Sequence, residues 1–354
     1  MANKRWLDPK TRNLILFFGL RLPVLLSVIY YSWIKFGDND PVRFFGQFCI
    51  FIIIWRSALS IYRRMILPAK HPKSYGKWCI ITGSTGGIGK EFVNNLANKG
   101  MSLLIISRTK SRLEEQKQEL EEKFPNIEVH YAVFDFTQSG KQRDEFIKHL
   151  DTQLKKLDAD GGIGMLINNV GTTNEIPMNL DEFDNKLVDD MVNCNIQGTV
   201  YMTRVVYPYM KARNNGCIVS ISSGSGNHAT PMLALYGASK AYITQFSRSM
   251  AVECWGTGVD FHVVTPYYIG GTNLYKRAKG TLIAPMPDAL VEGTLAQLGK
   301  KYTFQGHGYW FHGLLGNIAS YYWGSLDRWK KAMTGNRQRY DERQAAKAAE
   351  NKSE

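Results

Sequence analysis

The stretch TGSTGGIG, residues 82–89, constrains the fold more than any other part of the chain. It directly follows the apolar run KWCII and directly precedes a helical stretch, which predicts a turn from a strand into a helix rather than a flexible loop. Gly83 suits a tight turn, Gly87 lets the backbone approach a pyrophosphate, and Gly89 permits close helix–strand packing. The helix N-terminus would then attract the phosphate. The predicted cofactor contacts of this turn are Gly83, Ser84, Thr85, Gly87, Ile88 and Gly89.

Residues 74–272 alternate between short apolar runs and helical stretches. The runs MSLLIIS, IEVHYAVF, GMLIN, CIVSIS and VDFHVVT are rich in β-branched residues, and KEFVNNLANK and SRLEEQKQELEEKF are typical of helices. Strands that alternate with helices of this length predict βαβ units and a doubly wound parallel sheet, the Rossmann type of α/β fold. With 354 residues, the chain is long enough for this domain and for further regions at both ends.

The end of the second predicted strand indicates which dinucleotide binds. A site for NAD usually has an acidic residue there, whereas the sequence SRTKSR offers Arg108 and Arg112 and no acid. Guanidinium groups bind a 2′-phosphate and stack on adenine, so NADP(H) is the predicted cofactor. Asp135 follows the third strand and is expected to reach the adenine amino group. Asn169 and Gly171, in NNVG after the fourth strand, are expected to support that strand and the nicotinamide ribose.

The stretch YGASK, residues 236–240, places Tyr236 and Lys240 on one face of a predicted helix. A lysine ammonium beside a phenol lowers its pKa, although two ordinary residues of a helix surface would show the same spacing. Ser223 ends the fifth strand, and Asn195 lies on the preceding helix. The carboxyl ends of parallel strands share the edge where ligands bind. Asn195, Ser223, Tyr236 and Lys240 are therefore predicted to converge near the nicotinamide.

These motifs, together with VTP after the sixth strand, resemble the short-chain dehydrogenase/reductase family in order and spacing over residues 74–272. The resemblance implies that Tyr236 is a general acid and that Lys240 lowers its pKa and binds the nicotinamide ribose. It also implies that Ser223 orients a substrate carbonyl and that Asn195 holds a proton-relay water. Hydride addition builds negative charge on the carbonyl oxygen, which hydrogen bonds from Ser223 and Tyr236 stabilise.

The loop after the sixth strand departs from the family pattern. The resemblance carries cofactor contacts over to Pro266 and Ile269. Thr272, however, stands six residues past Pro266, where the family usually has five. Gly270 and Gly271 make the loop pliant. A contact between Thr272 and the cofactor carboxamide therefore stays open.

Within the family, the chain is most similar to a membrane-bound branch, the very-long-chain 3-oxoacyl-CoA reductases, also called the 17β-hydroxysteroid dehydrogenase type 12 branch. The resemblance rests on PKSYGKWCIITGSTGGIGK, on NNVG, on TPYY where most members have Pro-Gly, and on the apolar N-terminal and aromatic C-terminal segments. It implies an NADPH-dependent reductase of long-chain 3-oxoacyl-CoA in fatty-acid elongation, with its catalytic domain on the cytosolic face of the endoplasmic reticulum membrane. A 17β-hydroxysteroid dehydrogenase, a 3-ketosphinganine reductase and a catalytically silent NADP(H)-binding adaptor are the alternatives.

Residues 1–73 form a separate region with two apolar runs, residues 13–34 and residues 44–55. Arg21 and Pro23 interrupt the first run, and the second has only 12 residues, so both fall short of a clean membrane span. Positive charge at both ends favours a hairpin anchor with both ends cytosolic. A single span, an in-plane anchor and packing against a partner remain alternatives.

Residues 273–354 form the third predicted region. Its aromatic stretch, residues 302–324, is expected to cover a hydrophobic substrate channel or to lie at a membrane interface. The charged, alanine-rich stretch from Arg328 onward is expected to be an exposed helix. His307 and His312 have no metal-ligand spacing, and a role in packing or at an interface is predicted for them.

The net charge and the cysteines limit the classes of partner that the chain is expected to bind. The net charge of +13 fits an anionic membrane surface or the phosphates of an acyl-CoA. Basic residues bracket apolar segments instead of alternating with aromatics, which argues against nucleic acid. The five scattered cysteines form no C-x-x-C pair, so the sequence predicts neither a metal site nor a disulfide framework. The catalytic part is expected to face a reducing compartment. A lipid substrate, the membrane, other elongation enzymes and a second copy of the chain are the expected partners.

Overall fold

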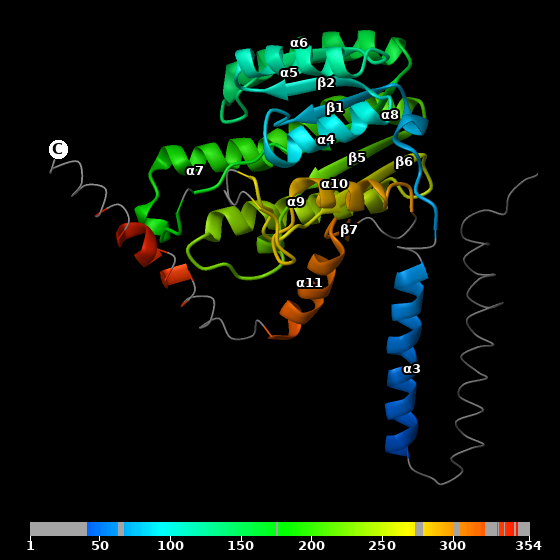
Figure 1. The fold of residues 1–354 in the computed structure, drawn as a ribbon, viewed down its shortest axis with the longest axis vertical. Coiled ribbons are helices and arrows are strands. Elements are labelled where there is room, and N and C mark those ends of the chain that lie inside the picture. The colour runs from blue at the N-terminus through cyan, green and yellow to red at the C-terminus, as the bar shows by residue number, and fades with distance from the viewer. Residues whose placement is uncertain are drawn as a thin grey trace, which may run out of the picture. The chain divides into compact units, whose positions relative to one another are not determined.

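The computed structural model describes residues 41–62, 67–174, 176–272, 279–300 and 305–322, and parts of 331–345. The chain divides into two units, Met1–Leu67 and Pro68–Glu354 (Figure 1). In the first unit, helix α3 (Pro41–Ile61) contains the apolar run predicted at residues 44–55. The run at residues 13–34 lies outside the described residues. Of the helices that the structure describes, none combines the length and apolarity that a membrane crossing needs.

The second unit is built on one parallel sheet of seven strands, in the order β3-β2-β1-β4-β5-β6-β7 (Figure 1). Every neighbouring pair in this order is parallel. The chain order reverses between β1 and β4, so a crevice for a ligand is expected at the carboxyl ends of these two strands. The prediction of a doubly wound Rossmann sheet is confirmed. The strands are β1 (Trp78–Thr82), β2 (Ser102–Ser107), β3 (Val129–Val133), β4 (Ile163–Asn168), β5 (Gly216–Ile221), β6 (Val259–Val264) and β7 (Gln305–Gly306).

Helices cover both faces of the sheet because the central strands are apolar on both sides. In β1, Cys79 and Ile81 belong to one buried cluster, whereas Trp78 and Ile80 belong to another, as the alternation of side chains in a strand requires. The first cluster includes residues of α4 (Gly87–Asn98), α5 (Lys110–Lys123) and α10 (Pro287–Leu295). The second includes residues of α6 (Gly140–Ala159), α8 (Gly198–Ala212) and the end of α9 (Ala234–Glu253).

The C-terminal region adds to the sheet that residues 74–272 form. Strand β7 pairs with β6 through Val263–Gln305 and Val264–Gly306, and α10 packs on α4. Helix α11 (Trp310–Tyr322) follows β7 within the predicted aromatic stretch. A two-residue strand leaves no pattern in a sequence, because alternation needs about four residues to be visible.

The described residues after 330 are helical and most of them are exposed, as expected, but some also contact the rest of this unit. Met333 is 3% exposed. Arg337 binds the carboxylate of Glu182 at 3.1 Å and donates to the carbonyl oxygen of Pro177 at 3.0 Å. This part of the chain is therefore docked on the loop that follows β4.

Candidate active site

The glycine turn between β1 and α4 is shaped by backbone contacts. Gly83 and Gly87 have φ angles of +65° and +51°, in the left-handed region that favours glycine. A Cβ on Gly89 would lie 2.1 Å from the carbonyl oxygen of Gly83, so only glycine fits there. The amide nitrogen Nδ2 of Asn169 donates to the carbonyl oxygens of Thr82 and Gly83, at 3.0 and 3.1 Å. The end of β4 thus fixes the turn that the sequence assigns to a pyrophosphate.

The remaining residues of the turn tie it to β2 and to the core. The hydroxyl of Thr85 lies 3.0 Å from the hydroxyl of Ser107, at the end of β2. Gln116, which the sequence did not single out, donates to the carbonyl oxygen of Ser84 at 2.9 Å. Ile88 packs against the buried cluster under α4. The buried Ser84 hydroxyl has no hydrogen-bond partner among the described residues.

The two arginines proposed for the 2′-phosphate lie next to this turn in the fold. Arg108 directly follows β2 and Arg112 lies in the first turn of α5, and both side chains are exposed. Asp135 accepts hydrogen bonds from the backbone N–H of Thr137 at 3.0 Å and from its hydroxyl at 2.9 Å. These bonds hold the Asp135 carboxylate at the carboxyl end of β3. The predicted adenine site therefore presents two exposed guanidinium groups and one anchored carboxylate.

Tyr236 and Lys240 lie one turn apart in α9, and both are buried. The Nζ atom of Lys240 donates to the carbonyl oxygen of Ile221 at 3.0 Å and lies 5.7 Å from the centre of the Tyr236 ring. A Cβ on Gly171 would lie only 3.1 Å from this Nζ, so the glycine of NNVG makes room for the lysine. The predicted meeting of the β4 end, the β5 end and α9 is thus present in the structure.

The pKa values at this site differ from the simple picture of a lysine that acidifies a tyrosine. Burial raises the pKa of the Tyr236 phenol, and the hydrogen bond with the Ser223 hydroxyl opposes that rise. Burial also lowers the pKa of Lys240 to about 8. The predicted direction for Tyr236 is therefore wrong for this site, because desolvation disfavours the phenolate more strongly than the neighbouring groups favour it.

Asn195 lies in a π-helical segment, Val192–Gln197, between α7 (Asn185–Met191) and α8. Its Oδ1 accepts from the backbone N–H of Thr172 at 2.7 Å. Its Nδ2 donates to the carbonyl oxygen of Thr172 and to the hydroxyl of Ser239, both at 2.9 Å. The side chain thus binds the loop after β4 to α9. Its role in holding a proton-relay water stays a prediction.

Neither the π-helical segment nor the hydrogen bonds of Thr172 could be predicted from the sequence. Single π-turns inside helices often occur at functional sites, but no residue pattern announces them. Ser239, in contrast, lies inside YGASK, so its presence near the site could have been predicted from its position one residue before Lys240.

The serine turn after β5 contacts the loop after β6. The hydroxyl of Ser223 accepts from the backbone N–H of Ser225 at 3.2 Å. The next residue, Gly224, donates its N–H to the carbonyl oxygen of Pro266 at 2.8 Å. Pro266 is thus placed at the same edge of the sheet as Ser223.

The extra residue in the loop after β6 does not carry Thr272 away from the glycine turn. Ile269 is buried, and its carbonyl oxygen accepts from the Thr272 hydroxyl at 2.9 Å. A Cβ on Gly87 would lie 3.5 Å from Cγ2 of Thr272. Thr272 therefore lies against the predicted pyrophosphate site, and its contact with the carboxamide stays a prediction.

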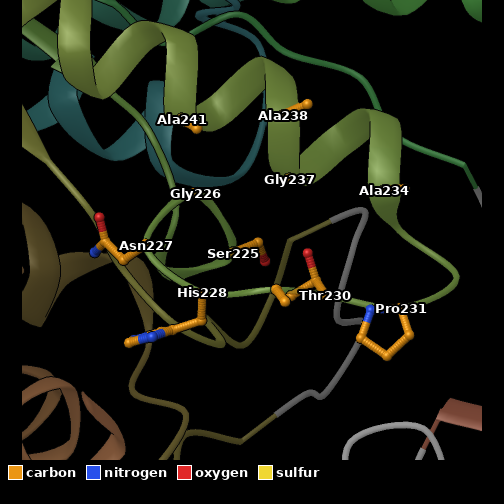
Figure 2. Close-up of a pocket in the computed structure, with 11 residues that line it drawn as sticks. Ser225, Gly226, Asn227, His228, Thr230, Pro231, Ala234, Gly237, Ala238 and Ala241 are labelled. Atoms are coloured by element: carbon orange, nitrogen blue, oxygen red, sulfur yellow. The ribbon is translucent and has the colours of Figure 1, made fainter. Parts of the chain in front are cut away.

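A surface cavity of about 690 Å³ opens beside the serine turn (Figure 2). The loop after Ser223 forms one wall, and the small residues of α9 form the other, on a different face of the helix from Tyr236 and Lys240. The lining residues are Ser225, Gly226, Asn227, His228, Ala229, Thr230, Pro231, Ala234, Gly237, Ala238 and Ala241. The cavity is therefore next to the predicted reaction site and lined mostly by small side chains.

The two C-terminal histidines make packing contacts. The buried ring of His312 accepts from the N–H of Tyr267 at 3.3 Å and donates to the carbonyl oxygen of Ile283 at 2.9 Å. His307 donates to the carbonyl oxygen of Thr265 at 2.8 Å. In the described ranges of the chain, no three His, Cys, Asp or Glu residues are grouped so as to hold a metal ion.

Comparison with known proteins identifies relatives over most of the chain. A sequence profile described as short chain dehydrogenase matches residues 77–281. A protein named very-long-chain 3-oxoacyl-CoA reductase from Homo sapiens is 36% identical over 248 residues, which are 69% of this chain and 75% of that protein. A protein of the same name from Podospora anserina is 34% identical over 255 residues, which are 70% of this chain and 73% of that protein.

Solved structures share the fold. A chain from a study of 7beta-hydroxysteroid dehydrogenase stereoselectivity has a TM-score of 0.61 and 22% identity, and the match covers 75% of this chain and 100% of that one. At this identity, the likeness shows the fold alone. A serine dehydrogenase in a closed form complexed with NADP+ has a TM-score of 0.52 and 27% identity, covering 61% of this chain and 87% of that one.

Proposed function

The chain belongs to the short-chain dehydrogenase family and is an oxidoreductase, and we propose that it uses NADPH to reduce the keto group of a very-long-chain 3-oxoacyl-CoA in fatty-acid elongation. The family predicted from residues 74–272 is thereby confirmed. The observation that carries the proposal is the meeting of Ser223, Tyr236 and Lys240 at one edge of the sheet, beside the glycine turn. The name that these relatives share supports a very-long-chain 3-oxoacyl-CoA as the substrate.

The residues of the crevice fit a dinucleotide with a 2′-phosphate. Gly83 and Gly89 let the turn pack closely against its neighbours, the space beside Gly86 is open, and the buried Ser84 hydroxyl is unpaired within the described part of the chain. Arg108 and Arg112 present exposed guanidinium groups, which suit a phosphate better than a ribose hydroxyl. These features support NADPH over NADH. When bound, the cofactor supplies the hydride.

The side chains of the site supply the rest of the reduction. The carbonyl oxygen of the substrate accepts hydrogen bonds from the hydroxyls of Ser223 and Tyr236, which stabilise the negative charge that develops on it. Because burial raises the pKa of Tyr236, the phenol is protonated at neutral pH and gives its proton to this oxygen. Lys240, held by the carbonyl oxygen of Ile221, is placed to bind the ribose and to stabilise the phenolate that remains.

Exposed apolar side chains support a lipid substrate. Trp310 and Leu314 lie one turn apart on α11 and are 68% and 48% exposed. Leu282 and Ile283, also exposed, belong to a segment that contacts α11 through the hydrogen bond from His312 to Ile283. An apolar surface of this kind fits a long acyl chain or the lipid from which it comes. The net charge of +13 favours the phosphates of a CoA thioester.

A location at the endoplasmic reticulum membrane, with the catalytic domain cytosolic, is part of the proposal. Its support is the apolar helix α3, on which Phe45, Ile50 and Ile54 are exposed, together with the basic residues that flank the apolar run. Contacts with other elongation enzymes and with a second copy of the chain stay predictions. The complete set of reactive side chains disfavours a silent adaptor, because an adaptor has no use for an intact proton donor.

The test is NADPH oxidation by the purified full-length chain in detergent. Three substrate classes are supplied at equal concentration: 3-oxoacyl-CoAs of increasing chain length, oxosteroids and 3-ketosphinganine. The proposal expects the highest kcat/KM with a long 3-oxoacyl-CoA. A higher value with an oxosteroid or with 3-ketosphinganine would reassign the substrate. Negligible rates with all three would remove the proposed reaction and leave the family assignment in place.

A further inference from the structure

We propose that Tyr267 is a positioning residue that holds the Ser223–Gly224 turn against the C-terminal segment, so that the placement of the reactive serine depends on the seating of α11. Tyr267 follows Pro266 in TPYY, where the sequence departs from the Pro-Gly of most family members. The inference rests on the proposed function in one respect, which is that Ser223 binds the substrate carbonyl.

The ring of Tyr267 lies directly on the backbone of the serine turn. A Cβ on Gly224 would lie 2.5, 2.6 and 2.9 Å from three carbon atoms of this ring, so the ring occupies the space in which a side chain would stand. The N–H of Gly224 donates to the carbonyl oxygen of Pro266 at 2.8 Å. One residue after Ser223, the turn is therefore held both by the loop backbone and by the aromatic ring.

The hydroxyl, the backbone N–H and the ring of Tyr267 also contact residues from other parts of the chain. Its hydroxyl lies 3.1 Å from Nε2 of His228, in the loop that follows the serine turn. Its N–H donates to Nδ1 of His312 on α11. Its ring stacks on His307, with ring centres 5.8 Å apart, and meets His312 edge-on at 5.7 Å. Tyr267 thus contacts the serine turn, the loop beside the cavity and the C-terminal segment at once.

Through Tyr267, the position of the C-terminal segment affects where the Ser223 hydroxyl lies. Ser223 must place its hydroxyl within hydrogen-bond reach of the developing oxyanion, and small misplacements of such a donor are costly. A glycine after Pro266 would leave the Gly224 backbone without a neighbour on that side and would remove the link to His228. We therefore expect loss of the Tyr267 contacts to lower turnover without changing how tightly NADPH binds.

The experiment compares Tyr267→Phe and Tyr267→Leu in the full-length chain with a matched control, Tyr268→Phe. Tyr268 is the next residue and is 46% exposed. Tyr267→Phe keeps the ring and loses the hydroxyl contact, so kcat is expected to fall about fivefold, the size of one hydrogen bond. Tyr267→Leu also loses the stacking, so kcat is expected to fall on the order of 10²-fold. KM, the Kd of NADPH and all values for Tyr268→Phe are expected to match wild type.

A double-mutant cycle shows whether Tyr267 acts through the serine. In a Ser223→Ala background, Tyr267→Leu is expected to have little further effect on kcat, because the group that it positions is absent. A full, independent loss in that background would overturn the proposal, as would an unchanged kcat for Tyr267→Leu in the wild-type background.

A readout independent of activity separates this inference from the proposed reaction. Hydrogen–deuterium exchange of the peptide that contains Gly224 and Ser225 is expected to be faster in Tyr267→Leu than in wild type or Tyr268→Phe. If wild type reduces no 3-oxoacyl-CoA but this acceleration is present, the reaction is wrong and the positioning contact stands. Exchange unchanged by Tyr267→Leu would overturn the positioning role whatever the substrate.

Discussion

The glycine turn at residues 82–89 and the serine turn at residues 222–226 both follow a strand of the same sheet, but different contacts hold them. The first is shaped by glycine backbone and by Asn169, one strand away. The second is held by Tyr267 and Pro266 from the loop after β6, and through them by α11. The cofactor side is therefore specified locally, whereas the carbonyl side depends on contacts between distant segments.

The largest expected effect is on the carbonyl side. Ser223→Ala removes one donor to the developing oxyanion, and kcat is expected to fall by about 10²–10³-fold. Because the proposed partner of Ser223 is the substrate carbonyl and not the cofactor, the Kd of NADPH should not change. Steady-state kinetics and a fluorescence titration with NADPH measure both quantities. The conservative Ser223→Thr, which keeps a hydroxyl, should retain more activity, and equal losses in both variants would contradict the role given to the hydroxyl.

On the cofactor side, Gly89→Ala is expected to break the glycine turn. The added Cβ would lie 2.1 Å from the carbonyl oxygen of Gly83, so the turn must shift. Overpacking of this kind costs about 1–3 kcal/mol of folding free energy. Denaturant unfolding and NADPH titration are both expected to show losses.

Gly86→Ala is the matched control for stability in that experiment. A Cβ on Gly86 would have no neighbour within 4 Å, and its φ of −164° is extended backbone that any residue adopts. The free energy of unfolding should stay near the wild-type value. Equal destabilisation by both substitutions would argue against the close packing of α4 on β1 as the cause.

The buried Lys240 predicts a pH dependence of stability. Burial lowers its pKa from 10.5 to about 8, so between these two pH values the unfolded chain binds the proton and the folded chain does not. Stability should therefore rise with pH across this window, by about 3 kcal/mol for this group, and the contribution should be lost as the pH falls to 8. The difference in unfolding free energy between wild type and Lys240→Met, measured against pH without cofactor, isolates this group. A flat difference would show that Lys240 is not desolvated.

The choice between NADPH and NADH should depend on the exposed arginines. Arg108→Gln removes one charged donor from the proposed 2′-phosphate site, and kcat/KM with NADPH is expected to fall about tenfold while the value with NADH changes little. Lys110→Gln, at an exposed cation that begins α5 and pairs with Glu114 at 3.6 Å, is the matched control. An equal loss with both cofactors would assign Arg108 to structure instead of selectivity.

The smallest expected effect concerns the C-terminal docking. Arg337→Gln removes the ion pair with Glu182, and half-exposed pairs of this kind contribute up to about 1 kcal/mol. We expect a small loss of stability and faster proteolysis after residue 330. Lys331→Gln, at an exposed lysine of the same segment, should leave the proteolysis pattern unchanged. If both variants behave alike, the contact with Glu182 does not hold the segment.

The sequence predicts the parts of the site that depend on local pattern. The glycine turn, six of the seven strands and the spacing of Tyr236 and Lys240 each leave a signature within a few neighbouring residues. The parallel, doubly wound arrangement of the sheet follows from the alternation of strands and helices. Strand β7, the π-helical segment at Asn195 and the docking of Arg337 leave no such signature, because residues far apart in the chain determine them.

The direction of the pKa shift of Tyr236 also could not be predicted from the sequence. Four-residue spacing to Lys240 suggests a lowered value, since it shows a neighbouring positive charge. Spacing does not show that both side chains are buried or that Lys240 donates to Ile221, and burial reverses the direction of the shift. The environment of a group, unlike its neighbours along a helix, becomes visible only when the packing is known.

The most direct test of the central claim is NADPH oxidation with a long-chain 3-oxoacyl-CoA by wild type and by Tyr236→Phe, with NADPH affinity measured on the same preparations. The account predicts that the variant binds NADPH as wild type does but loses about 10²–10⁴-fold in kcat, because the ring remains and the proton donor is gone. Turnover by Tyr236→Phe at the wild-type rate would contradict the account.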